Sequence, residues 1–366
     1  MRHVPPKAEL KIRLQKFRAV LAQNKLPGIL ISDDANVRYL SGFTGHDSAL
    51  VITQKGKFIL TDGRYTEEAQ LTAPGWKIVL KPRDIMEKAA TIAREQRLRA
   101  LGVEPETLNM GSAARLKKFL KRIALKPVSG LVTGLRKIKS PWELKQIEHA
   151  LKIQEKVFLQ VVRLLRPGIR EFEAAAELRH RMVLAGADEQ AFECMVQFGS
   201  NASLPHGRPT DRILKEGNIV LIDWGCKYAG YHADLTRTFF VGSIPARLRK
   251  IHEIVAQAQA AAVARVGPGV PFSEVDKAAR DVIRKAGYGK QFMHSTGHGI
   301  GLRIHEAPGL SFAAKGNLEP GMVVTVEPGI YLPGVGGVRL EDDVLVTAKG
   351  HRVLSRLPIG LRGNGK

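Results

Sequence analysis

The sequence predicts an α+β protein of two domains, in which a smaller α/β domain precedes a larger domain of helices and antiparallel hairpins. The chain has 366 residues, more than most single hydrophobic cores organise. Helix and strand patterns alternate in the first third, whereas helices come in pairs before strand-rich segments in the remainder. Between these two parts of the chain, Gly130 and Gly134 interrupt the hydrophobic periodicity. We therefore expect domains over residues 1–133 and 134–366.

The first domain has the pattern of one small α/β unit. A helical pattern covers residues 10–21, and Pro27 with Gly28 then opens an apolar strand. Further strands are expected at residues 49–53, 57–61, 76–80 and 100–103, and helices from about residue 65 and over residues 85–96.

The second domain begins with a clear helix start. Ser140 is the expected N-cap, Pro141 occupies the first helical position, and Glu143 completes a capping box. This helix should run to about residue 165, before Pro167 and Gly168. Later helices are expected over residues 171–185, 247–266 and 273–286, and strands within residues 192–198, 218–240 and 322–347. Hairpins in these segments predict an antiparallel sheet.

The chain is strongly basic, with a formal net charge of +22 at pH 7 and a pI of about 10.1. Residues 108–141 contain no Asp or Glu, and such a field attracts polyanions. The basic residues of this run are Arg115, Lys117, Lys118, Lys121, Arg122, Lys126, Arg136, Lys137 and Lys139. Leu116, Phe119, Leu120 and Ile123 recur at helical spacing, so we favour a solvated helix face over a nucleic-acid or membrane surface.

Cysteine content and hydropathy indicate the cellular compartment in which the protein is expected. Cys194 and Cys226 cannot form a disulfide framework and lack CxxC spacing, so we expect both to be buried small residues in a reducing compartment. The first ten residues contain no apolar signal region, and no stretch approaches the ~20 apolar residues of a membrane span. We therefore expect a soluble, cytoplasmic protein without a membrane partner.

Residues 294–306 read His-Ser-Thr-Gly-His-Gly-Ile-Gly-Leu-Arg-Ile-His-Glu and have the composition of a site. Three histidines and three glycines are costly in an ordinary strand or helix, because glycine weakens both and buried imidazoles need partners. His298 lies between two glycines, where a ligand or metal can approach closely, and His305 follows seven residues later. Alone, the two histidines fit a structural pair as well as a metal or catalytic pair.

Asp223 interrupts an apolar strand, and Asp234 lies on the returning strand of the same hairpin. With a turn at Tyr228 and Ala229, the two carboxylates would lie opposite each other, about 5 Å apart. Like charges at this separation must share a proton, meet cations or be solvated.

A second hairpin repeats the arrangement with Glu327 and Glu341, and its turn centres near Gly334. Together with one neutral imidazole, the four carboxylates could balance two divalent cations. This oxygen-rich set favours Mn²⁺, Fe²⁺, Co²⁺ or Zn²⁺ over a thiolate zinc site. A two-metal hydrolase is therefore the leading hypothesis.

These residues resemble the pita-bread metallopeptidases (family M24), in the branch of Xaa-Pro dipeptidase (prolidase) and aminopeptidase P. Residues 294–306 match the signature of that branch, while residues 36–45 and 61–65 resemble the creatinase-type N-terminal domain. The ordered ligand set, with spacings of 11, 64, 29 and 14 residues, is filled by Asp223, Asp234, His298, Glu327 and Glu341. The resemblance implies a pita-bread catalytic domain behind a creatinase-type α/β domain. It disfavours methionine aminopeptidases, which lack the N-terminal domain, and creatinases, which lack the full metal set.

The resemblance also implies two divalent metal ions per subunit, with Mn²⁺ expected first and Co²⁺, Zn²⁺ or Fe²⁺ as alternatives. Asp234 and Glu341 would bridge the ions, Asp223 would complete one site, and His298 with Glu327 the other. The ions would polarise the scissile carbonyl and supply hydroxide near neutral pH. Glu327 would also shuttle protons.

The resemblance assigns further residues to the substrate. His206 matches a histidine that contacts the substrate near the transition state, and His305 matches one that lines the prolyl side of the pocket. His232 precedes Asp234 by two residues, and Arg339 precedes Glu341 by two. Each could therefore lie on the same strand face as a metal ligand and contact that ligand without binding the metal. We expect Arg339 to orient Glu341, and His232 to support or pack beside Asp234.

The expected activity is hydrolysis of the Xaa-Pro imide bond in dipeptides or short peptides by a homodimer. One departure concerns Gly309, which stands where several prolidases have an arginine thought to hold the dipeptide carboxylate. An aminopeptidase P that releases the residue before proline from longer peptides is therefore the alternative. A non-catalytic protein of the same fold with a polyanion-binding surface is the third hypothesis, although no nucleic-acid motif accompanies the charge.

Overall fold

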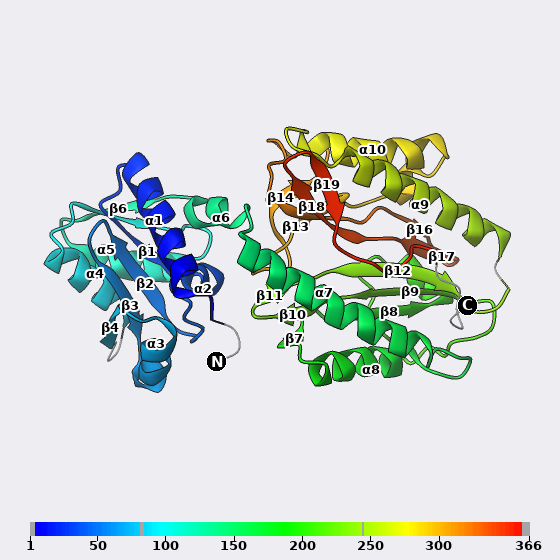
Figure 1. Cartoon of the computed structure of the whole chain (residues 1–366), viewed down its shortest axis with the longest axis horizontal. Helices are drawn as coiled ribbons and strands as arrows, with labels where there is room; N and C mark the ends of the chain where they lie inside the picture. The colour runs from blue at the N-terminus through cyan, green and yellow to red at the C-terminus, as the bar shows by residue number, and fades with distance from the viewer. Residues whose placement is uncertain (1–3, 81–83, 244, 361–366) are drawn as a thin grey trace. The chain divides into compact units, whose positions relative to one another are not determined.

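The computed structural model describes residues 4–80, 84–243 and 245–360. The chain divides into two compact units, Met1–Arg136 and Lys137–Lys366 (Figure 1). Within the described ranges, no helix combines the length and apolar character needed to cross a membrane.

The N-terminal unit is a six-stranded sheet flanked by helices, with the strand order β4-β3-β2-β1-β5-β6 (Figure 1). The strands are β1 (Gly28–Ile31), β2 (Ala49–Thr53), β3 (Lys57–Thr61), β4 (Lys77–Leu80), β5 (Ala100–Val103) and β6 (Ala124–Pro127). The helices are α1 (Lys7–Gln23), α2 (Asp34–Ser41), α3 (Thr66–Thr72), α4 (Ile85–Glu95), α5 (Met110–Leu120) and α6 (Leu131–Arg136), with a 3₁₀ turn at Gly63–Tyr65. The predicted α/β class is confirmed. The sheet is mixed, because β2 pairs antiparallel with β1 and β3, whereas the pairs β1-β5, β5-β6 and β3-β4 are parallel.

The basic run contains both exposed and buried cations. Helix α5 buries Leu116 and leaves Lys117 and Lys118 exposed, as the amphipathic pattern predicts. However, Arg136 and Lys139 are buried, so the solvated-face interpretation is wrong for these two residues. Lys139 lies 2.9 Å from Glu306, a pairing between distant segments that no local pattern reveals.

The C-terminal unit packs two helix pairs on opposite sides of its strands (Figure 1). The pairs are α7 (Pro141–Val162) with α8 (Glu171–Leu184), and α9 (Ala246–Arg265) with α10 (Phe272–Lys285). Ser140 caps α7 in a complete capping box with Glu143, which confirms the predicted start. The paired helices thus enclose the strands that carry the acidic residues.

Antiparallel sheets fill the space between the helix pairs. They have the orders β11-β10-β7, β12-β9-β8, β14-β13-β15-β18-β19 and β16-β17. The strands are β7 (Glu189–Gln190), β8 (Met195–Phe198), β9 (Ile219–Trp224), β10 (Cys226–Tyr228), β11 (Tyr231–His232), β12 (Leu235–Phe240), β13 (Gly297–Gly299), β14 (Glu306–Leu310), β15 (Val323–Val326), β16 (Gly329–Leu332), β17 (Gly336–Arg339), β18 (Asp342–Thr347) and β19 (Gly350–Val353). Two 3₁₀ turns, Gly199–Ser203 and Gly289–Gln291, also belong to this unit.

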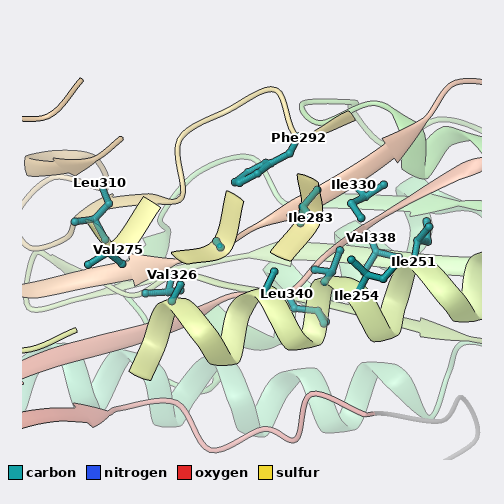
Figure 2. Packing of buried hydrophobic residues seen from close by; sticks show 14 of the residues in the cluster. Ile251, Ile254, Val275, Ile283, Phe292, Leu310, Val326, Ile330, Val338 and Leu340 are labelled. Atoms are coloured by element: carbon teal, nitrogen blue, oxygen red, sulfur yellow. The ribbon is translucent and has the colours of Figure 1, made fainter. Parts of the chain in front are cut away.

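Helices α9 and α10 press an apolar layer against these strands (Figure 2). Ile251 and Ile283 from the helices, Val326 from β15 and Leu340 directly after β17 are all fully buried. Each such side chain contributes about 1.5–3 kcal/mol through burial. Val326 and Leu340 each precede a predicted ligand by one residue, so this core fixes the backbone of the site. Cys194 and Cys226 are also buried, as predicted.

The first acidic hairpin has a different register from the prediction. Asp223 lies opposite Thr236, not Asp234. The turn is at Ala229 and Gly230, which both have positive φ (51° and 77°), one residue later than predicted. Asp234 therefore lies diagonally from Asp223, in the short segment between β11 and β12.

The second acidic hairpin keeps one register through two ladders. Val326 pairs with Asp342 in one, and Gly329 with Arg339 in the other, so Glu327 and Glu341 fall opposite each other at the junction. Their amides bond elsewhere: Glu327 donates to the Thr296 carbonyl and Glu341 to the Thr236 carbonyl. These bonds tie both ligand positions to neighbouring strands.

Candidate metal centre

The five predicted ligands from separate segments line one pocket of about 570 Å³. They are Asp223 at the end of β9, Asp234 before β12, His298 in β13, Glu327 after β15 and Glu341 before β18. The sequence therefore brings together residues up to 118 positions apart, from Asp223 to Glu341, in one cavity. His206 and His305 line the same pocket.

Three of these residues form a compact ligand group. One donor atom each from Asp234, His298 and Glu341 lies within 4.8 Å of the others. Glu327 is close by, with its Oε1 3.4 Å from His298 Nε2, whereas Asp234 Oδ2 is 3.8 Å from the same nitrogen. Such spacing allows one divalent ion to reach several donors at once.

The tautomer of His298 favours a cation. Nδ1 lies 3.1 Å from the Gly299 carbonyl, which can only accept a hydrogen bond. Nδ1 therefore carries the proton, and the lone pair of Nε2 points toward the carboxylates. Burial lowers the pKa of His298 to about 4, so the ring is neutral at pH 7. A lone pair aimed at carboxylate oxygens is unfavourable unless a proton or a metal ion lies between them.

Unpaired carboxylate oxygens give a second indication of a cation. Among the described residues, Asp223 Oδ1, Asp234 Oδ1 and Glu341 Oε1 are buried without a hydrogen-bond partner. Leaving such oxygens buried and bare is costly, and divalent ions with oxygen ligands satisfy them. The residues present thus fit a metal centre.

The electrostatics agree with this interpretation. Burial raises the pKa of Asp234 well above its usual range, and Glu341 and Asp223 raise it further. Burial and the Glu327 carboxylate likewise raise the pKa of Glu341. Glu327 itself has a pKa of about 8, chiefly because of burial. The protein alone therefore supplies too little positive charge for this cluster.

Arg339 is the buried cation of the cluster, but its partners differ from the prediction. Its Nη2 contacts Asp223, not Glu341, and its Nε donates to the Thr236 hydroxyl at 3.0 Å. That hydroxyl donates in turn to Glu341 Oε2 at 2.7 Å. Arg339 therefore reaches Glu341 through Thr236, because its long side chain crosses to the first acidic hairpin.

The remaining predicted residues lie in different surroundings. His206 and His305 are exposed at the pocket, and the His305 ring stands perpendicular to His298 at a centroid distance of 4.2 Å. His232 is buried outside the pocket lining, where its amide and Nδ1 lie 2.8 and 3.0 Å from the Gly301 carbonyl. It thereby fixes the turn that follows His298.

Sequence reasoning missed several contacts of the centre. His294 Nε2 lies 2.9 Å from the Tyr331 hydroxyl, which accepts a 2.8 Å hydrogen bond from Arg339. Asp343 Oδ2 accepts the Asp234 amide at 3.3 Å. His294 opens the histidine-rich stretch and could have been singled out from it, whereas Tyr331 carries no comparable sequence signal.

An oxygen-rich cluster with one imidazole at an open pocket is typical of metal-dependent hydrolases. The sequence model of metallopeptidase family M24 matches residues 145–348, and that of the creatinase/prolidase N-terminal domain matches residues 13–138. The chain therefore belongs to metallopeptidase family M24, whose members use divalent metal ions.

Individual relatives are similar to this chain over nearly its full length. A Bacillus subtilis (strain 168) protein described as uncharacterized peptidase YqhT is 40% identical over 347 residues, which is 95% of this chain and 98% of the relative. The structure of an Xaa-Pro dipeptidase from Bacillus anthracis has a TM-score of 0.93 and 39% identity, covering 96% of this chain and 99% of that one. An X-Pro aminopeptidase from Thermotoga maritima has a TM-score of 0.87 and 32% identity, covering 93% and 99%. The expected fold, a pita-bread catalytic domain behind a creatinase-type domain, is confirmed.

Proposed function

We propose that this protein is an Xaa-Pro dipeptidase that uses two divalent ions, with Mn²⁺ preferred, to hydrolyse the imide bond before proline. The observation that carries the proposal is the convergence of His298 Nε2 and unpaired carboxylate oxygens in one pocket. Proline's imide lacks an N–H and fixes φ, so its cleavage favours a dedicated pocket. Similarity to the Xaa-Pro dipeptidase from Bacillus anthracis supports this substrate.

We assign the ligands as the resemblance implies: Asp234 and Glu341 shared by both ions, Asp223 in one site, and His298 with Glu327 in the other. When bound, the ions would polarise the scissile carbonyl and lower the pKa of a water molecule. His206 and His305 would contact the substrate from the exposed side of the pocket. Glu327, with its raised pKa of about 8, is suited to accept and return a proton near neutral pH.

Arg339 would maintain the geometry of this centre rather than touch the substrate. It holds Asp223 directly and Glu341 through Thr236, so the two acidic hairpins keep their spacing. We further propose a cytoplasmic homodimer and a domain boundary between residues 133 and 134.

A second candidate is an aminopeptidase P that acts on longer peptides. It is favoured by Gly309, whose Cα faces open space: a Cβ there would have no atom within 4 Å. The missing arginine and the free space would both suit a substrate that continues beyond proline. Similarity to the X-Pro aminopeptidase from Thermotoga maritima supports this alternative.

Metal-stripped protein refilled with Mn²⁺, Co²⁺ or Zn²⁺ tests the proposal, with Xaa-Pro dipeptides and Xaa-Pro-Xaa tripeptides as substrates. We expect faster cleavage of the dipeptide and no cleavage by Asp234→Ala. Preference for the tripeptide would select the aminopeptidase P candidate. If no metal supports cleavage of either substrate, the protein is a non-catalytic member of the fold.

A further inference from the structure

Two arginines line the pocket, and only one of them has donors to spare. Arg339 is fully engaged: Nε bonds Thr236, Nη1 bonds Tyr331 and the Pro205 carbonyl, and Nη2 contacts Asp223. A substrate carboxylate could reach this guanidinium only by breaking contacts that hold the metal ligands. Arg339 is therefore unsuited to substrate binding.

Arg208 has the opposite surroundings. Its side chain is 82% exposed at the pocket and contacts Glu193 through Nε, at 3.1 Å. Within the described part of the chain, its two Nη groups have no partner. These groups form the planar fork that matches a carboxylate. An exposed ion pair of this kind is weak, so a substrate group can replace Glu193 at little cost.

Strand β14 provides no side chain at position 309 to bind a substrate carboxylate. Gly309 pairs directly with His298 across β13 and β14, so a side chain at position 309 would lie on the face of that ligand. Glycine supplies no group there, and a Cβ added at this position would have no atom within 4 Å. Apolar groups suited to a pyrrolidine ring also line the pocket, namely Phe192, Pro205, Pro209 and Ile304.

We propose that Arg208 is a specificity-determining residue that binds the free C-terminal carboxylate of the dipeptide. The substrate carboxylate replaces Glu193 as the partner of the Arg208 guanidinium. Glu193 then acts as a competitor that holds the guanidinium at the pocket when no substrate is bound. The inference rests on the proposed dipeptidase function. It explains how a chain with glycine at position 309 can select a free carboxylate.

Kinetics of the Mn²⁺-loaded enzyme test the proposal with an Xaa-Pro dipeptide and the matching Xaa-Pro amide. Arg208→Ala should raise KM for the dipeptide about tenfold more than KM for the amide, because one charge-assisted contact is lost. Arg208→Lys should restore part of the difference, and Glu193→Gln should lower KM for the dipeptide. Arg166→Ala removes an exposed arginine outside the pocket and should change neither KM.

A binding measurement separates this inference from the proposed function. Calorimetry with L-proline and L-prolinamide should show a preference for proline in the wild type that Arg208→Ala removes. If this preference is present without hydrolysis of any Xaa-Pro substrate, the proposed function fails and the carboxylate site stands. If Arg208→Ala alters the two ligands and the two substrates equally, or alters none of them, Arg208 does not bind the carboxylate.

Discussion

The Thr236 hydroxyl donates a 2.7 Å hydrogen bond to Glu341 Oε2, across 105 positions of sequence. The same hydroxyl accepts from Arg339 Nε. One buried threonine therefore joins the cation of the centre to one of its carboxylates, and the orientation of Glu341 depends on both.

Thr236→Val should weaken metal binding, because valine keeps the shape and removes both hydrogen bonds. We expect about a tenfold rise in the Kd for Mn²⁺, in the range of lost contacts behind metal ligands. The unpaired Arg339 Nε should also lower the free energy of unfolding by about 1–3 kcal/mol. Calorimetric metal titration and urea unfolding measure the two effects. Thr236→Ser keeps the hydroxyl and should stay close to wild type; equal losses in both variants would refute the role of the hydrogen bond.

Asp234→Asn should stabilise the metal-free protein and abolish its stabilisation by metal. Burial and the neighbouring carboxylates raise the pKa of Asp234, so the metal-free folded state must either bind a proton there or bear the repulsion, and asparagine removes this cost. Thermal unfolding with EDTA and with Mn²⁺ should show a higher Tm than wild type in EDTA and no increase on metal addition.

Asp342 offers a matched control for this experiment. It is also buried, but its carboxylate is paired with Arg237 at 2.7 Å and accepts from Gln259 and Ser355. Asp342→Asn should therefore lower the Tm with and without Mn²⁺. Destabilisation of the metal-free protein by Asp234→Asn as well would contradict the charge argument.

Local chemistry made the elements and the candidate carboxylates predictable. The Ser140 capping box has a signal within four residues, and the carboxylates stand out because they interrupt apolar strands. The second hairpin was placed correctly because a glycine at position 334 marks its centre. Such features depend on neighbours in sequence.

Contacts between residues far apart in the chain could not be predicted from local sequence patterns. The first hairpin turns at Ala229 and Gly230 with positive φ at both positions, and alanine gives no warning of this conformation. The partners of Arg339 lie on other strands, so its link to Asp223 and Tyr331 depends on packing. Burial of Lys139 beside Glu306 has the same cause.

The metal-free protein should lose stability as the pH rises from 6.5 to 8. Folded Glu327 has a pKa of about 8, whereas an unfolded glutamate has about 4.3. The folded state therefore holds more protons in this range, and the free energy of unfolding falls with pH. His298 acts in the opposite direction, but only below about pH 6.5, because its pKa is lowered to about 4.

Urea unfolding in EDTA at several pH values checks this slope, which reaches about 1.4 kcal/mol per pH unit for one group. Glu327→Gln should make the slope shallower, and saturating Mn²⁺ should reverse the loss. A wild-type protein whose stability in EDTA increases from pH 6.5 to 8 would show that the cluster does not retain protons.

Two glycines on paired strands should respond differently to the same methyl group. A Cβ at Gly297 would lie 1.9 Å from the Thr325 carbonyl oxygen, whereas one at Gly309 would have no atom within 4 Å. Gly297→Ala should push β13 from β15, lower the free energy of unfolding by about 1–3 kcal/mol or more, and raise the Kd for Mn²⁺ by moving His298. Gly309→Ala should stay within about 0.5 kcal/mol of wild type and keep its metal affinity. Urea unfolding and metal titration compare the pair; similar effects of both substitutions would mean that the close approach of Gly297 to Thr325 does not position His298.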